Sequence, residues 1–312
     1  MVPGIVEEFD LVRKEIFMLV LVFLAACSTQ PPQTATSTPG LPEVLAVETF
    51  LADIVRNVTG DRLIVESLLP INSDPHSYQP APRDIISVTN SNVLVINGGG
   101  IETFIAPLLD NAGGSRLVIT ASAGLISLPD PSGEHPEGDP HFWMDPNNVV
   151  RYVENIRDGL IQADPQGRQV YTDNAATYIR QLQSLDSWIA DQVAQIPQDQ
   201  RQLVTNHESL GYFAARYGFT LVGSIIPSVS SESSPTASQL AKLIDQIRAS
   251  GSRAIFMETG ANTNLAEQIS AETNVILVTN LYTASVSDVH GPAPTYIDMM
   301  KYNVNQIVNA LK

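Results

Sequence analysis

The chain of 312 residues exceeds the usual size of one domain, so its length favours two domains. A hydrophobic content of 44% indicates a globular protein with a sizeable core. The formal net charge of -16 makes the chain a poor candidate for binding nucleic acid, because phosphate contacts need clustered Lys and Arg.

The first 40 residues are expected to lie outside the fold. Two basic residues precede an apolar run, 16–26, which is too short to cross a bilayer but has the length of a signal-peptide core. The run ends in LAAC, which resembles a bacterial lipoprotein cleavage box with Cys27 as the lipidated first residue of the mature chain. The alternative is a buried free thiol. We interpret 1–26 as a signal peptide and 27–40, which has no large apolar side chain, as a tether.

Residues 41–164 alternate short apolar runs with helical segments. The expected strands are 43–49, 62–70, 92–98 and 115–120, and the expected helices are 50–58, 82–90, 101–111 and 149–163. Asp145 and Pro146 suit the N-cap and first turn of the last of these helices. Apolar strands separated by helices predict a parallel sheet covered on both faces.

Residues 165–197 are predicted to form one long connecting helix. Apolar side chains recur at helical spacing from Tyr171 to Ile196, and Pro197 ends the pattern. At 1.5 Å per residue the helix would be about 45 Å long, enough to bridge two lobes.

Residues 198–312 repeat the alternation. The expected strands are 201–206, 220–225, 253–258 and 274–279, and the expected helices are 208–218, 236–250 and 295–312. Ser234 and Pro235 are expected to cap the second helix, and Gly251 to end it. The predicted fold class is α/β, with two β/α lobes that have parallel sheets and are joined by one long helix.

Two of the five histidines, His76 and His141, stand in the same Asp-Pro-His triplet. Proline restricts its own φ and the residue before it, so each of these histidines has lost freedom before anything binds. His76 follows the second expected strand, His141 the fourth, and His207 the first strand of the second lobe. Since ligands bind at the carboxyl ends of parallel strands, we expect the three imidazoles to meet across an interlobe cleft.

Other polar residues leave alternatives open. His135, in an acidic loop, is either solvated or a transient metal contact, and His290 suits a turn. Asp74 and Asp139 either cap turns or orient the imidazoles, whereas Asp145 is expected to cap a helix.

Three neutral imidazoles favour zinc and also suit other borderline divalent metals, whereas magnesium or calcium would need oxygen ligands. The sequence has no His-Glu-x-x-His helix, no Gly-rich phosphate loop and no Ser or Cys elbow. A three-histidine site with an open position is also what catalytic zinc uses, so a zinc hydrolase with Glu208 as base is the alternative. A surface adhesin is a third reading, but it explains none of the histidines.

Four motifs, DPHSYQPAPRD, DPHFWMDP, TNHESLGYFAARYGF and TYIDMMKYNV, resemble those of the zinc/manganese ABC-transporter solute-binding lipoproteins. The resemblance extends from Cys27 to the end of the chain and implies that His76, His141 and His207 bind the metal. The family's usual fourth ligand is an aspartate, and Ala284 stands in its place. Water or Asp288 would then complete the coordination.

The resemblance also implies a function that is not enzymatic. The protein would capture Zn²⁺, or next Mn²⁺, outside the cytoplasm and deliver it to an ABC permease driven by an ATPase. It would be anchored to the membrane through Cys27 and act as a monomer.

Overall fold

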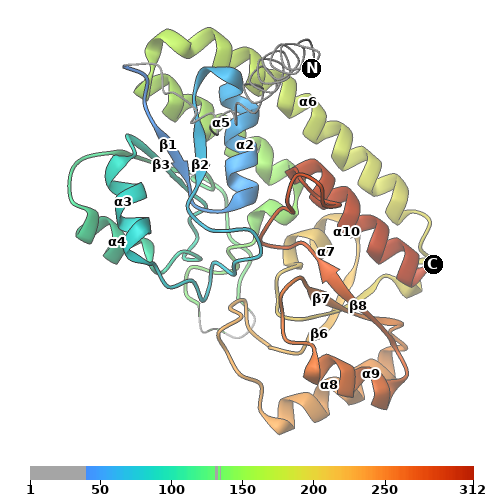
Figure 1. The fold of residues 1–312 in the computed structure, drawn as a ribbon. Coiled ribbons are helices and arrows are strands. Elements are labelled where there is room, and N and C mark those ends of the chain that lie inside the picture. Colours follow the sequence, from blue (N-terminus) through green and yellow to red (C-terminus); the bar gives the residue numbers. More distant parts are fainter. Residues whose placement is uncertain (1–39, 131–132, 134) are drawn as a thin grey trace, which may run out of the picture. The chain divides into compact units, whose positions relative to one another are not determined.

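The computed structural model describes residues 40–130, 133 and 135–312. These residues form two four-stranded parallel sheets with flanking helices and one long helix beside both (Figure 1). The predicted fold class is therefore confirmed. The predicted signal peptide, Cys27 and the tether up to residue 39 lie outside the described residues. None of the helices in the described ranges combines the length and apolar character needed to cross a membrane.

The first lobe has the strand order β2-β1-β3-β4. Its strands are β1 (Val44–Ala46), β2 (Val65–Ser67), β3 (Val93–Ile96) and β4 (Leu117–Thr120). Its helices are α2 (Thr49–Thr59), α3 (Pro82–Asn90), α4 (Ile105–Ala112) and α5 (Pro146–Ala163). Side chains of β1 alternate between the two faces, so Val44 and Ala46 pack with α2 and α5 while Leu45 packs with α3 and α4.

The second lobe has the equivalent order β6-β5-β7-β8. Its strands are β5 (Gln202–Thr205), β6 (Thr220–Ser224), β7 (Ala254–Glu258) and β8 (Ile276–Leu281). Its helices are α7 (Gly211–Tyr217), α8 (Ala237–Ser250), α9 (Asn264–Thr273) and α10 (Tyr296–Leu311). Ile255 and Met257 pack toward α8 and α9, whereas Phe256 faces the side of α7 and α10. Short 3-10 helices occupy Gly60–Arg62, Phe142–Met144, Pro165–Gly167 and Gln198–Gln200.

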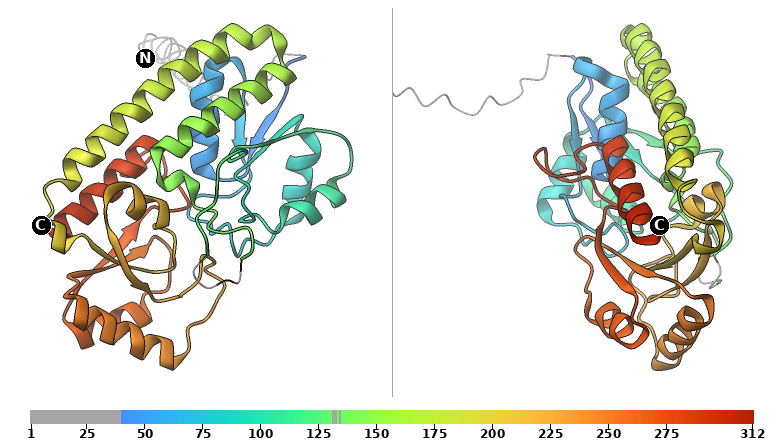
Figure 2. Two further views of the ribbon diagram at one scale, coloured as in Figure 1. Left: turned by 180° about the vertical axis from the view of Figure 1, so that it is seen from behind. Right: turned by 90° about the vertical axis from the view of Figure 1, so that its right-hand side faces the viewer.

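The long helix α6 (Arg168–Val193) packs on α2 and α5 of the first lobe and on α7 and α10 of the second (Figure 2). It is shorter than the predicted 165–197: it begins later because Pro165–Gly167 form a 3-10 turn, and it ends at Val193. Asp164 fixes this turn by accepting from Arg62 Nη2 at 3.0 Å and from the Tyr171 hydroxyl at 2.6 Å. One apolar cluster runs from β1 through α6 to Leu311. The described residues from 40 to 312 accordingly form one compact unit, and the predicted domain boundaries stay a prediction.

The observed ends of helices α5 and α8 can be compared with the predicted caps. Asp145 caps α5 by accepting from the backbone N–H of Asn147, and Gly251 ends α8 with a φ of 72°, both as predicted. The predicted N-cap of α8, Ser234 and Pro235, was wrong. Thr236 is the N-cap, and its side chain accepts from the backbone N–H of Gln239 in a capping box.

Two helix predictions also differ from the structure. Helix α4 begins at Ile105 rather than residue 101, because the Glu102 carboxylate turns back to accept from the backbone N–H groups of Asn97 and Gly98. Helix α9 was not predicted at all. Only two of its residues, Ala266 and Ile269, are buried, so its apolar pattern is weak.

Candidate metal site

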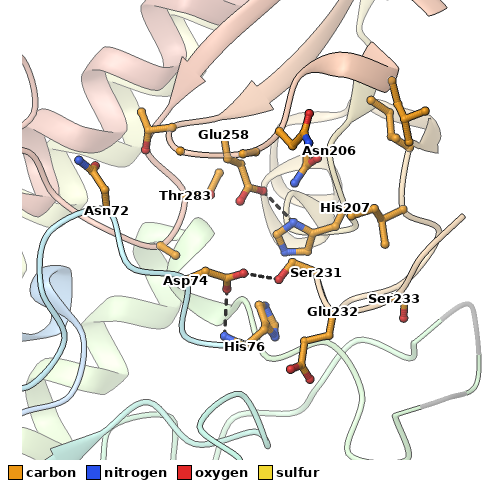
Figure 3. Close-up of a pocket in the computed structure, with 18 of the residues that line it drawn as sticks. Asn72, Asp74, His76, Asn206, His207, Ser231, Glu232, Ser233, Glu258 and Thr283 are labelled. Atoms are coloured by element: carbon orange, nitrogen blue, oxygen red, sulfur yellow. Dashed lines mark hydrogen bonds and ion pairs between the residues drawn. The ribbon is translucent and has the colours of Figure 1, made fainter. Parts of the chain in front are cut away.

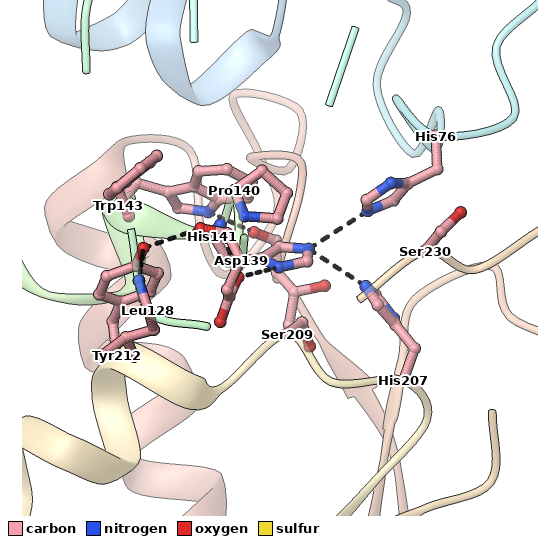
Figure 4. A network of polar contacts seen from close by, with 12 residues as sticks. His76, Leu128, Asp139, Pro140, His141, Trp143, His207, Ser209, Tyr212 and Ser230 are labelled. Atoms are coloured by element: carbon pink, nitrogen blue, oxygen red, sulfur yellow. Dashed lines mark hydrogen bonds and ion pairs between the residues drawn. The ribbon is translucent and has the colours of Figure 1, made fainter. Parts of the chain in front are cut away.

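The structure brings the side chains of His76, His141 and His207 together between the lobes. His76 follows β2, His141 follows β4 and its long loop, and His207 lies two residues after β5. All three are at most 8% exposed. Nε2 of His141 lies 3.2 Å from Nε2 of His76 and 3.2 Å from Nε2 of His207 (Figure 4).

This spacing fits a tetrahedral ion. Nitrogen ligands about 2.0–2.1 Å from zinc lie about 3.3 Å apart at the tetrahedral angle. The two distances of 3.2 Å from Nε2 of His141 to the other Nε2 atoms match that edge length. One ligand nitrogen from each histidine lies within 4.8 Å of the others.

His141 is held by the aspartate of its own triplet. Asp139 Oδ1 accepts from the backbone N–H of His141 at 2.9 Å and lies 2.8 Å from the ring Nδ1. Tyr212 fixes the same turn by donating its hydroxyl to the backbone carbonyl of Asp139 at 2.7 Å. With Nδ1 bound to a carboxylate, the His141 ring directs the lone pair of Nε2 toward the other two histidines. Asp139 therefore acts in both of the ways that the sequence left open.

Asp74 differs from Asp139 despite the shared triplet. It accepts from the backbone N–H of His76 at 2.9 Å but, unlike Asp139, forms no hydrogen bond with the ring of its histidine. Its other oxygen accepts from Ser77 at 3.1 Å and from the hydroxyl of Ser231, which belongs to the second lobe (Figure 3). Of the two readings for Asp74, the turn cap is the one seen.

His207 has a carboxylate partner that sequence reasoning missed. Nδ1 of His207 lies 2.9 Å from Oε1 of Glu258, although off the direction of a well-aligned N–H bond (Figure 3). Glu258 is the last residue of β7, the strand next to β5, so its side chain emerges beside His207. Residues at the carboxyl ends of neighbouring parallel strands lie close together, and applying this rule to acids as well as histidines would have identified Glu258.

The protonation of these groups follows from burial and from their neighbours. Burial lowers the pKa of His76, and the neighbouring His141 and His207 lower it further. Burial would also lower the pKa of His207, but the carboxylate of Glu258 raises it above its ordinary value. Conversely, burial would raise the pKa of Glu258, but His207 and a hydrogen bond from Ser209 hold it below the usual range. Glu258 is thus an anion beside its histidine.

A cavity of about 620 Å³ adjoins the three histidines. Among the described residues, its lining includes the acids Asp74, Glu232 and Glu258 and no Lys or Arg, which favours a cation. Ala284 lines it too, in a loop attached to the first lobe through a 2.6 Å bond from Trp143 Nε1 to the carbonyl of Thr283.

The remaining sequence candidates lie elsewhere. Asp288 accepts from the backbone N–H of His290 in an exposed turn, as predicted for His290, and is not part of the described cavity lining. Glu208, the base of the hydrolase reading, is also absent from that lining. His135 lines a neighbouring hollow of about 500 Å³ together with Glu137 and Glu232.

Comparisons with known proteins agree with this geometry. Residues 44–310 match the family described as zinc-uptake complex component A, periplasmic. The manganese-binding lipoprotein MntA of Halalkalibacterium halodurans is 34% identical over 297 residues, covering 95% of this chain and 97% of that protein. The iron-binding protein YfeA of Yersinia pestis is 32% identical over 266 residues, covering 85% of each chain.

A solved structure shows the same fold. The periplasmic zinc-binding protein TroA of Treponema pallidum has a TM-score of 0.78 and 27% identity, over 87% of this chain and 99% of that one. The match to the family covers both lobes and all three histidines. This chain therefore belongs to the family of the periplasmic component A of zinc-uptake complexes.

Proposed function

We propose that this protein is the extracytoplasmic solute-binding component of an ABC importer for a divalent metal ion. It binds one ion through Nε2 of His76, His141 and His207 and delivers it to a membrane permease driven by an ATPase. The observation that supports this most directly is the convergence of three buried imidazoles from two lobes, in which Nε2 of His141 lies at a tetrahedral edge length from Nε2 of each of the other two.

The chemistry of the donors favours zinc as the cargo. Relatives in the family are named for manganese, iron or zinc, so membership alone does not choose the metal. Three imidazoles and no carboxylate at the position of Ala284 make a softer site than one with an added oxygen ligand, and this favours zinc over manganese.

Equilibrium titration of the purified mature chain with zinc and manganese tests the proposal. We expect one zinc ion per chain, bound more tightly than manganese in direct competition. Absence of saturable binding of either metal would contradict the proposed function. A tighter site for manganese would contradict only the choice of cargo.

The family of transport proteins gives no support for the hydrolase alternative, and we infer that the site captures an ion without catalysis. A cation held mainly by neutral imidazoles can be released intact to the permease. Assay of the zinc-loaded protein against ester and phosphoester substrates should show no turnover that depends on His207.

We further infer that Cys27 carries a lipid that anchors the protein to the membrane, and that the protein acts as a monomer. Cys27 follows a short apolar run and a small-residue box. Cys27→Ala should abolish incorporation of labelled lipid in cells, whereas unchanged labelling would reject the anchor. Analytical ultracentrifugation of the mature chain tests whether the protein is a monomer in solution.

A further inference from the structure

The three histidines are supported unequally. Asp139 holds Nδ1 of His141, and Glu258 lies 2.9 Å from Nδ1 of His207. No side chain or backbone group among the described residues forms a hydrogen bond with Nδ1 of His76, and its ring packs near those of His141 and His207. Two of the three histidine rings therefore have a carboxylate beside Nδ1 before an ion arrives.

Glu258 is not placed to be a ligand itself. The two nitrogens of an imidazole lie on opposite sides of the ring, so an ion at Nε2 of His207 lies on the side away from Glu258. The Glu258 carboxylate is also held in place, because Ser209 donates its hydroxyl to Oε1 at 2.9 Å. Among the described residues, the group whose ligand atoms lie within 4.8 Å of one another comprises the three histidines and does not include Glu258.

We propose that Glu258 is the positioning residue that presents Nε2 of His207 to the metal, an inference that rests on the proposed function. A carboxylate next to Nδ1 favours the tautomer with its proton on that nitrogen, which leaves the lone pair on Nε2. Without Glu258 the proton can move to Nε2, where it blocks coordination, and the ring is free to turn. Glu258 thereby does for the second lobe what Asp139 does for the first.

Zinc affinity of the mature chain, measured by competition with a chromogenic chelator, gives the first test. Glu258→Ala should weaken binding about 10–100-fold, the usual effect of removing an outer partner of a ligand histidine. Glu258→Gln should lose less, since its amide oxygen can still lie beside Nδ1, and Ser209→Ala should lose least. Thermal melting of the metal-free variants checks that they fold. If Glu258→Ala does not fold, unchanged affinity in Glu258→Gln overturns the proposal.

Nitrogen-15 spectra of the histidine rings in the metal-free protein give a readout that a purely structural role would not change. His207 should carry its proton on Nδ1 in the wild type and shift toward Nε2 in Glu258→Ala, while His141 stays unchanged as an internal control. Weaker zinc binding with the His207 tautomer retained would overturn the role. Wild-type affinity in Glu258→Ala would do so as well. Failure of the wild type to bind zinc would instead contradict the proposed function.

Discussion

The two lobes have the same order of strands but use the ends of those strands differently. In the second lobe, His207 lies two residues after the central strand β5, and Glu258 ends its neighbour β7. In the first lobe, Glu48 lies two residues after the equivalent strand β1, and Glu102 follows the equivalent β3. In the second lobe Glu258 lies beside a histidine, whereas in the first lobe Glu48 lies beside another acid, Glu102.

The partner decides the charge of each acid. Burial and the nearby Glu102 raise the pKa of Glu48 well above its ordinary value. Burial likewise raises the pKa of Glu102 to about 7, although the backbone N–H groups of Gly98 and Asn97 oppose the rise. The neighbouring His207 and a hydrogen bond from Ser209 hold the pKa of Glu258 below its usual range, so Glu258 is an anion. Equivalent strand ends thus give two carboxyl groups that retain a proton in the first lobe, and an ionised carboxylate beside a histidine in the second.

Removal of His141 should have the largest effect, because its Nε2 lies 3.2 Å from both other histidines. We expect His141→Ala to weaken zinc binding by more than about 100-fold, beyond the loss typical of an outer partner. Calorimetric titration measures this, and His290→Ala, in an exposed turn, is the control. A His141→Ala protein that titrates like wild type would mean that the first lobe supplies no essential ligand.

The acid pair of the first lobe should make stability fall with rising pH. The folded protein keeps a proton that the unfolded chain releases above about pH 4.5, the ordinary value for Glu. Its stabilising contribution is therefore complete below that pH and is lost as pH rises through the folded value of about 7 for Glu102. We expect wild type to lose about 1–3 kcal/mol more than Glu48→Gln between pH 5 and 9.

Urea unfolding at several pH values measures this difference. The amide of Glu48→Gln can donate to an ionised Glu102, so its stability should depend less on pH. Glu66→Gln, at an exposed position, serves as the control and should follow wild type. If Glu48→Gln and wild type have parallel pH profiles, the two acids do not share a proton.

The sequence predicted the histidines better than it predicted the groups that hold them. His76, His141 and His207 could be found because strand ends in a parallel sheet converge and because proline stiffens two of the three positions. Glu258 was within reach of the same rule, since the strand 253–258 was predicted to end on it. Asp74 and Asp139 share a triplet, yet only tertiary contacts decide that one caps a turn while the other holds a ring.

The acid pair was beyond sequence reasoning. Glu48 and Glu102 are at most 8% exposed, although acids are rarely buried, and nothing in the hydrophobic pattern marks them. Their burial depends on a network in which Asn97 donates to the carbonyl of Pro140 at 3.1 Å and accepts from the hydroxyl of Tyr152. Pro140 lies 43 residues from Asn97, so the contact is visible only in the fold.

An acidic residue at position 284 should change the relative affinities for manganese and zinc. Ala284 lines the cavity beside the histidines, so Ala284→Asp should add an anionic oxygen and tighten manganese binding by roughly tenfold, about 1.4 kcal/mol. Zinc binding should tighten less. Asp288→Ala should change neither metal, because Asp288 lies outside the described cavity lining. Competition titrations of both variants would contradict this if Asp288→Ala loosened the metal.

The contact between Ser231 and Asp74 should have the smallest effect. It joins the two lobes next to His76, so its loss should ease opening of the cleft. We expect Ser231→Ala to release zinc to a chelator about two- to tenfold faster, as fits one hydrogen bond of about 0.5–1.5 kcal/mol. Ser233→Ala, which also lines the cavity, is the control in stopped-flow measurements. Equal release rates for the two variants would show that this contact does not link the lobes.

The apolar cluster that runs through α6 has a consequence for how such chains can evolve. Leu182, Leu185 and Ile189 of α6 share that cluster with residues of both sheets. A lobe separated from the other would expose its half of the cluster to water, at about 25 cal/mol for each Å² uncovered. The lobes are therefore poor units for recombination between relatives. Divergence in cargo is expected to proceed by substitutions at strand ends, such as the alanine at position 284, rather than by exchange of whole lobes.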